Sequence, residues 1–223
     1  MGEAELHKTS GELIIRSVFY FYGDATTPEL ASRIASDIEK HWNEPGSSVV
    51  IRNKSYVVRF EIQGFSDPHL KPETVWYNDD PRCNYFRLEH FALGNISFVD
   101  GIGSNTGYFK VDNLLQTSTT AAHEYGHTLG LVHPSHLDLR GGKDPGIMYP
   151  RGTICDPQLQ YTPTAAPGEY GGFLDPRHRR VLDADIQALK LPKLDFDDRG
   201  MATVGDFTSL YHEKHEEGFT EGA

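Results

Sequence analysis

The chain has 223 residues, of which 38% are hydrophobic and 11% aromatic, enough to build the core of one domain. Its formal net charge is −11, which argues against a nucleic-acid partner, because such proteins need a basic face. The longest apolar runs have the length of strands, well short of the roughly 20 residues that span a membrane. We therefore expect one globular domain with no membrane span.

Residues 1–11 are polar and acidic and contain no apolar signal-peptide core, so we expect a flexible N-terminus. The protein then either stays inside the cell or is a mature or excised piece of a larger secreted or delivered polypeptide. Two cysteines, Cys83 and Cys155, are compatible with one disulfide or with two free thiols, and their number does not decide between these.

The first regular elements follow from β-branched and apolar patterns. Residues 12–23 are rich in β-branched and aromatic side chains and predict a buried strand. Residues 26–44 predict an amphipathic helix that Thr26 or Thr27 caps and that Pro28 opens. The apolar face of this helix repeats every four residues, at Leu30, Ile34, Ile38 and Trp42.

Shorter elements fill the middle of the chain. Residues 47–65 predict a hairpin around the polar turn "RNKS", and residues 69–84 predict a loop. Three further runs, broken by glycine and asparagine, predict short strands at 84–91, 95–101 and 107–114. Residues 117–131 are helical in composition, with Ser118 or Thr119 as the expected N-cap.

The last third of the chain has little periodicity. Residues 134–175 are rich in glycine and proline, and a loop of this length in a compact domain is usually functional or disordered. Residues 175–191 predict a final helix capped by Asp175, and residues 192–223 predict a polar acidic tail whose end, residues 212–223, is expected to fray. This order of elements favours an α+β or α/β domain with an irregular C-terminal third.

The segment "AAHEYGHTLGLVH" carries the most specific chemistry in the sequence. His123 and His127 are four residues apart, which places both imidazoles on one helix face, and Glu124 lies beside the first of them. Gly130 can end the helix with a positive φ, and the resulting turn lets His133 swing back as a third ligand. Because five fixed positions coincide, chance is a poor explanation for the whole pattern.

Three histidines that leave one coordination position open are typical of a catalytic zinc site, in which the glutamate of H-E-x-x-H acts as general base. One Zn²⁺ ion would lower the pKa of its water toward about 7 and polarise a carbonyl group. Glu124 would take the proton from that water and deliver it to the leaving amine. The motif therefore predicts amide hydrolysis at a site built by His123, His127 and His133.

The extended pattern H-E-x-x-H-x-x-G-x-x-H, followed downstream by "GIMYP", resembles the metzincin zinc endopeptidases. In that family a Met-turn methionine lies beneath the three histidines, and the matching residue here is Met148. Tyr149 follows it, where a phenol either supports the site or packs within the loop. The resemblance implies an α+β zincin fold: a twisted mixed β-sheet, an active-site helix, a backing helix, and an irregular C-terminal subdomain ending in a helix.

The same resemblance divides the chain into an N-terminal catalytic subdomain over 12–133 and a C-terminal subdomain over 134–191. It also implies a polypeptide substrate that adds as an extended strand along residues 95–101, the expected edge strand. The alternative is that residues 95–101 form an ordinary sheet strand. The sequence does not distinguish such a strand from one that binds substrate.

Within the metzincins, the zinc motif and "IMYP" are most similar to the matrixins, whose order of elements also matches over 12–191. Pro134 departs from that group and is more similar to the serralysins. We find no clear counterpart of the matrixin loops that hold structural Ca²⁺ and a second zinc, so structural Ca²⁺ stays open. The tripeptide "PRC" at 81–83 is similar to the matrixin cysteine switch but lies between expected strands, and we interpret it as coincidence.

The segments "FVDGIGSNTGYF" and "PGIMYPRGT" also resemble C-terminal domains of bacterial Rhs-type polymorphic toxins. That resemblance implies a delivered effector protease with one specific target, carried by a larger polypeptide. A function of another class is a non-catalytic zinc-binding interaction module. Glu124 argues against such a module, because a structural zinc site has no use for a general base.

Several other polar side chains have weaker signals. Additional potential ligands near the motif are His136, Asp138 and Asp144. His136 lacks a fixed offset from the motif and is interpreted as a surface residue. Tyr161 and Tyr170 lie where the wall of a substrate pocket would form, and His212 and His215 are expected in the solvated tail.

Overall fold

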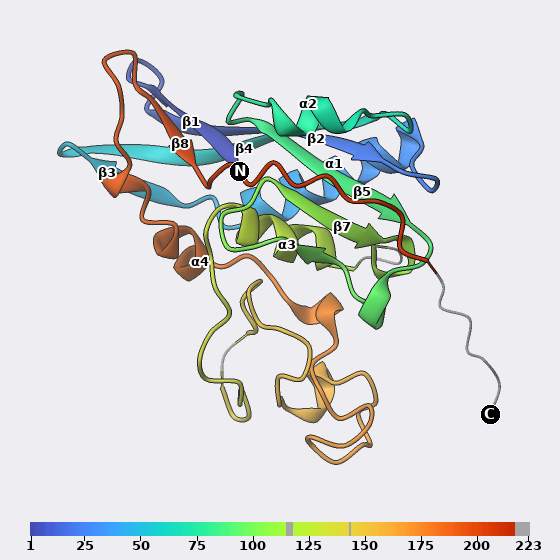
Figure 1. Cartoon of the computed structure of the whole chain (residues 1–223). Helices are drawn as coiled ribbons and strands as arrows, with labels where there is room; N and C mark the ends of the chain where they lie inside the picture. Colours follow the sequence, from blue (N-terminus) through green and yellow to red (C-terminus); the bar gives the residue numbers. More distant parts are fainter. Residues whose placement is uncertain (115–117, 143, 217–223) are drawn as a thin grey trace.

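The computed structural model describes residues 1–114, 118–142 and 144–216, and in this part a curled mixed β-sheet is combined with four α-helices (Figure 1). The neighbouring strands run in the order β3-β4-β2-β5-β7-β6, and β1 pairs with β2 and β8. Their bounds are β1 (Gly2–His7), β2 (Glu12–Tyr22), β3 (Ser48–Ile51), β4 (Lys54–Ser66), β5 (Cys83–Glu89), β6 (Phe98–Val99), β7 (Thr106–Lys110) and β8 (Met201–Val204). The chain is therefore a mixed α/β domain, compatible with the expected α+β class.

Strand directions give the sheet a parallel centre and antiparallel edges. β2 runs parallel to β4 and β5, and β5 runs parallel to β7. The outer pairs β3–β4 and β6–β7 are antiparallel, as are β1–β2 and β1–β8. β3 and β4 form the expected hairpin, and its turn residues Arg52 and Asn53 both have positive φ. β6, inside the expected strand 95–101, lies at the edge of the sheet.

The expectation of a flexible N-terminus is wrong, because residues 2–7 form β1. Alternate side chains of this strand, Ala4 and Leu6, are buried, while Glu3 and Glu5 between them are only partly covered. The outer partner of β1 is β8, so the tail expected from residue 192 onward also contains a paired strand. Of residues 212–223, which are expected to fray, residues 217–223 lie outside the described residues.

The chain after β8 packs against the sheet. The expectation that His212 and His215 lie in a solvated tail is therefore wrong. His212 Nε2 lies 2.8 Å from Asp100 Oδ1, and the His215 ring stacks on Tyr108 with 4.0 Å between ring centroids. Aromatic contacts that come from residues far apart in sequence therefore hold a segment whose own composition is polar.

Helix α1 (Pro28–Asn43) packs on the sheet and forms the expected backing helix. Thr27 is its N-cap and accepts a hydrogen bond from the Leu30 N–H, and Ala31, Ile34, Ala35, Ile38 and Trp42 are buried. The helix approaches β4 so closely that a Cβ at Gly64 would lie 2.3 Å from the Ala31 carbonyl oxygen. Gly64 therefore sets the distance between helix and sheet.

The remaining helices are short. α2 (Pro72–Trp76) lies in the segment expected to be a loop. The expected final helix is wrong in extent: Pro176–His178 form one 3₁₀ turn, and α4 covers only Asp183–Ala188. Asp175 caps that 3₁₀ turn by accepting a hydrogen bond from the Arg177 N–H.

Helix α3 spans Thr120–Thr128. Between α3 and the 3₁₀ turn that begins at Pro176, the described residues are largely irregular and lie below the sheet in Figure 1. Cys83 and Cys155 are both buried and both free. Among the residues described, no helix is long and apolar enough to cross a membrane.

Candidate metal centre

Helix α3 carries the histidine motif through the interior of the protein, and all nine of its residues are buried. Trp42 of α1 donates a hydrogen bond from Nε1 to the Ala122 carbonyl oxygen at 3.0 Å. On the next turn, the Tyr125 hydroxyl lies 2.7 Å from Ser17 Oγ on β2. The helix is thus fixed by the backing helix and the sheet.

Thr119 is the N-cap of α3, one of the two residues expected there, although its side chain makes no capping hydrogen bond. Its hydroxyl donates to the Pro176 carbonyl oxygen at 2.6 Å and accepts from Arg179 Nε at 2.9 Å. Thr119 therefore ties the helix to the C-terminal third of the chain.

The end of α3 has the turn that the motif requires. Gly130 has φ +98°, a conformation that costs glycine no steric energy. The Leu131 N–H donates back to the Gly126 carbonyl oxygen at 2.9 Å, which closes the helix. The chain then reverses and brings His133 to the ligand face of the helix.

The structure brings the three motif histidines together. His133 Nε2 lies 3.1 Å from His123 Nε2 and 3.0 Å from His127 Nε2. In the described part of the chain, these three residues are the one group of three or more His, Cys, Asp or Glu close enough to hold a metal ion.

The donor set fits a tetrahedral metal ion. Zinc–nitrogen bonds of about 2.0–2.1 Å in tetrahedral geometry place the nitrogens about 3.3 Å apart, close to the two separations above. The other ring nitrogens also have partners: His123 Nδ1 lies 2.7 Å from the Ile147 carbonyl oxygen, and His127 Nδ1 lies 2.8 Å from that of Leu131. Backbone acceptors of this kind orient ligand histidines and leave Nε2 free for the metal.

Burial keeps the imidazoles neutral, which is the form that binds a metal. It lowers the pKa of His123 well below the usual value and lowers that of His127 and His133 as well. His133 is the exposed member of the group. A metal ion held there has protein on one side and an accessible position on the other.

Glu124 lies beside the histidines, and its residue is 7% exposed. Burial raises the pKa of its carboxyl to about 8. The backbone of Val99 on β6 acts in the opposite direction and lowers this pKa. Glu124 and Val99 line the same hollow, so the carboxyl lies near the edge strand.

Met148 lies against the middle of α3. Its Sδ occupies the space beside Gly126, where a Cβ would approach it to 2.3 Å, and the residue is 3% exposed. The preceding carbonyl, that of Ile147, orients His123. Tyr149 is half-buried, and its carbonyl oxygen accepts a hydrogen bond from Arg179 Nη1 at 3.0 Å.

Two hollows are lined by Glu124 together with ligand histidines. The larger, of about 360 Å³, runs along β6 and is lined by the apolar residues Ile96, Phe98, Val99 and Ile102. The smaller, of about 190 Å³, is lined on its far side by Pro150, Arg151 and Arg179. Both share His123, Glu124 and His133, so the candidate site opens in two directions.

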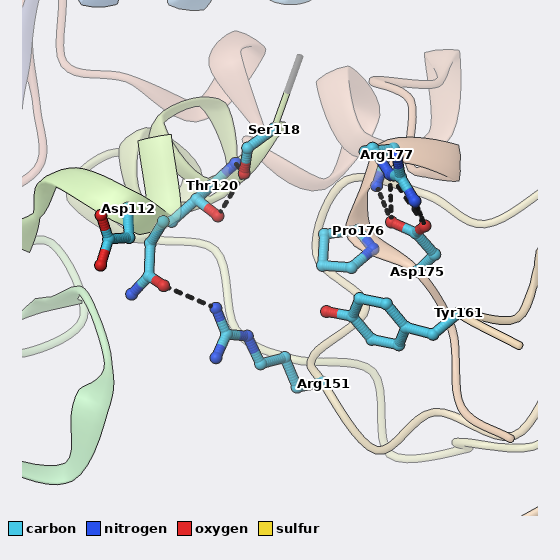
Figure 2. A pocket seen from close by; sticks show the side chains of 9 residues that line it. Asp112, Ser118, Thr120, Arg151, Tyr161, Asp175, Pro176 and Arg177 are labelled. Atoms are coloured by element: carbon cyan, nitrogen blue, oxygen red, sulfur yellow. Dashed lines mark hydrogen bonds and ion pairs between the residues drawn. The ribbon is translucent and has the colours of Figure 1, made fainter. Parts of the chain in front are cut away.

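A third pocket continues beyond Arg151 (Figure 2). Arg151 donates a hydrogen bond to Asn113 Oδ1 at 3.1 Å, and the Tyr161 hydroxyl points into the pocket. Tyr161 thus lines a pocket, and its place in a substrate-binding wall stays a prediction. The expectation for Tyr170 is wrong, because its side chain is fully exposed.

Arg179 is the functional candidate that the sequence did not indicate. It is 4% exposed, and burial lowers the pKa of its guanidinium to about 10, so it stays charged at neutral pH. Burying an uncompensated charge costs several kcal/mol. No local pattern in "RHRR" marks this residue, because its burial depends on contacts with Thr119 and Tyr149.

The other potential ligands do not join the metal group. His136, Asp138 and Asp144 are outside the histidine cluster. His136 and Asp144 are exposed, and Asp138 pairs with Arg140.

No protein-family model and no curated protein matches this sequence. The geometry of the site therefore carries the functional interpretation.

Proposed function

We propose that this chain is a zinc-dependent endopeptidase of metzincin type, with a zincin fold. The observation that carries the proposal is the convergence of three Nε2 atoms, two of them separated from the third by 3.0 and 3.1 Å, beside a buried carboxylate. A structural zinc site would fill its fourth position with a protein ligand, whereas this group opens into two hollows.

Each motif residue then has a defined task. His123, His127 and His133 would hold the zinc ion, which would supply Lewis-acid chemistry for activating a water molecule and polarising the scissile carbonyl. Glu124 takes the proton from the attacking water and gives it to the leaving nitrogen, since its carboxyl lies beside the histidines and lines both hollows. Gly130 supplies the turn, and Met148 packs under the helix between the first two ligands.

The edge strand supports a polypeptide substrate. β6 has one partner, β7, in the sheet, and the larger hollow runs beside it. An extended peptide can therefore add along this edge through main-chain hydrogen bonds. Such binding requires an unfolded or loop segment, which is the substrate class of an endopeptidase.

The test is a quenched-peptide assay on the zinc-loaded protein and on two variants. Glu124→Ala is expected to keep one equivalent of zinc and to lose about 10²–10⁴ of the hydrolysis rate. Glu29→Ala, an exposed glutamate on α1, is the matched control and should cleave as fast as the parent. Equal rates for Glu124→Ala and the parent would refute the mechanism, and bound zinc with no turnover on any polypeptide would favour the interaction module.

A further inference from the structure

Two arginines line the smaller hollow and have no task in the hydrolysis itself. Arg151 is exposed and Arg179 is buried, and both face the same space as Glu124 and His133. The chain holds 32 Asp and Glu against 21 Lys and Arg. Even so, no carboxylate oxygen among the described residues lies within 4.0 Å of either guanidinium.

The buried guanidinium is fixed in place without a direct ion pair, although Glu124 in the same hollow acts on it electrostatically and raises its pKa. Arg179 Nε donates to Thr119 Oγ1 at 2.9 Å, and Nη1 donates to the Tyr149 carbonyl oxygen at 3.0 Å. Both acceptors are neutral oxygens, one directly before α3 and the other directly after Met148. The cation is therefore held at a fixed position relative to the histidines, and its Nη2, which has no acceptor among the described residues, can donate to a carboxylate.

Charge is distributed unevenly around the site. The larger hollow is apolar along β6 and has no arginine or lysine in its lining. In the pocket of Figure 2, Arg177 is neutralised by Asp175, and Asp112 pairs with Lys110. Among the residues that line the two hollows, arginines occur only in the smaller one, where Glu124 is the one carboxyl. Two guanidinium groups against one carboxyl leave an excess of positive charge there, at Arg151 and Arg179.

We propose that the smaller hollow receives a substrate carboxylate next to the cleaved bond, held by Arg179 and Arg151. This inference rests on the proposed peptidase function and names its substrate class. The carboxylate has two possible sources: the side chain of an aspartate or glutamate within a longer chain, or the C-terminal carboxylate of a peptide that ends one residue past the bond.

The experiment uses four peptides with one core sequence and the zinc-loaded protein. Three are blocked at both ends and carry Glu, Gln or Lys beside the cleaved bond, and the fourth ends there in a free carboxylate. A charge-assisted contact predicts a kcat/KM about 10- to 100-fold higher for the Glu peptide than for the Gln peptide. Faster cleavage of the fourth peptide than of the Glu peptide would identify the chain terminus as the source.

Variants assign the preference to the arginines. Arg151→Ala should reduce the Glu-to-Gln ratio, and Arg151→Glu should reverse the preference toward the Lys peptide; both changes are at an exposed position that the fold tolerates. Arg199→Ala removes an exposed arginine at the β8 turn and should leave the ratio unchanged. Added salt should weaken the preference, because Arg151 is open to solvent.

A binding readout separates recognition from turnover. With Glu124→Gln, fluorescence anisotropy should give tighter binding of the Glu peptide than of the Gln peptide, and Arg179→Gln in that background should remove the difference. Equal kcat/KM for Glu, Gln and free-carboxylate peptides, or an unchanged ratio in Arg151→Glu, would overturn this inference alone. Failure of the zinc-loaded parent to cleave any peptide would instead overturn the proposed function.

Discussion

The face of α3 between the first two ligand histidines has no room for a methyl group. At Gly126, a Cβ would lie 2.3 Å from Met148 Sδ, 3.2 Å from Met148 Cε and 3.3 Å from Trp42 Cζ2. Because carbon contacts favour about 3.5–4.0 Å, Gly126→Ala has to move the thioether by roughly 1.5 Å. We expect this overpacking to cost about 1–3 kcal/mol, offset by about 1 kcal/mol of gained helix propensity.

The effect of Gly126→Ala on the free energy of unfolding should reverse its sign once Met148 is removed. Met148→Ala alone should destabilise the protein by about 2–5 kcal/mol through a cavity in the core. In that background, Gly126→Ala meets no sulfur atom and fills part of the cavity, so it should stabilise the fold by about 1 kcal/mol. The double-mutant cycle should then give a coupling of about 1–3 kcal/mol.

The assay is urea unfolding of all four proteins in the presence of a chelator, so that metal binding adds nothing to the free energy of unfolding. Gly101→Ala, where an added Cβ meets no atom within 4 Å, is the control and should show no coupling with Met148→Ala. If Gly126→Ala had the same effect with and without the methionine, the packing of Met148 against the helix would not be as described.

Three further predictions test other parts of the structure. His133→Ala removes the exposed ligand, so the affinity for zinc should fall at least about 100-fold in a chelator competition while urea unfolding in chelator stays unchanged. Cys83 and Cys155 should both react with a thiol reagent after denaturation, and in the folded protein the reaction should accelerate with pH because burial raises the pKa of Cys83 to about 11; a denatured protein without free thiols would contradict this. Replacing Arg52–Asn53 by Asn–Gly should stabilise the β3–β4 hairpin by about 1 kcal/mol in urea unfolding, since both positions have positive φ; a loss of stability would count against this turn geometry.

The metal group could be predicted from the sequence because its geometry is local. His123 and His127 depend only on the helical repeat, and His133 depends on one positive φ at Gly130. The backing helix could also be predicted from the sequence, because its apolar repeat and the Thr27 cap lie within one segment.

The rest depended on contacts between distant segments. Residues 175–191 have the cap, proline and apolar spacing of one helix, yet α4 begins only at Asp183. Before it, Arg179 donates hydrogen bonds to Thr119 and to the carbonyl oxygen of Tyr149. These tertiary contacts override the local preference for helix. For the same reason, the burial of Arg179 and its place in the smaller hollow could not be inferred from its neighbours in sequence.

The pairing of β1 with β8 has a kinetic consequence. Gly2 lies opposite Val204, so this seam closes a loop of almost the whole chain, and contacts of such long range form slowly. The seam is also connected to the metal centre: Ser17 donates to the Met1 carbonyl oxygen and contacts the Tyr125 hydroxyl on α3. Hydrogen exchange should therefore find β1 and β8 opening together as one unit, and that opening would loosen the helix that presents the histidines.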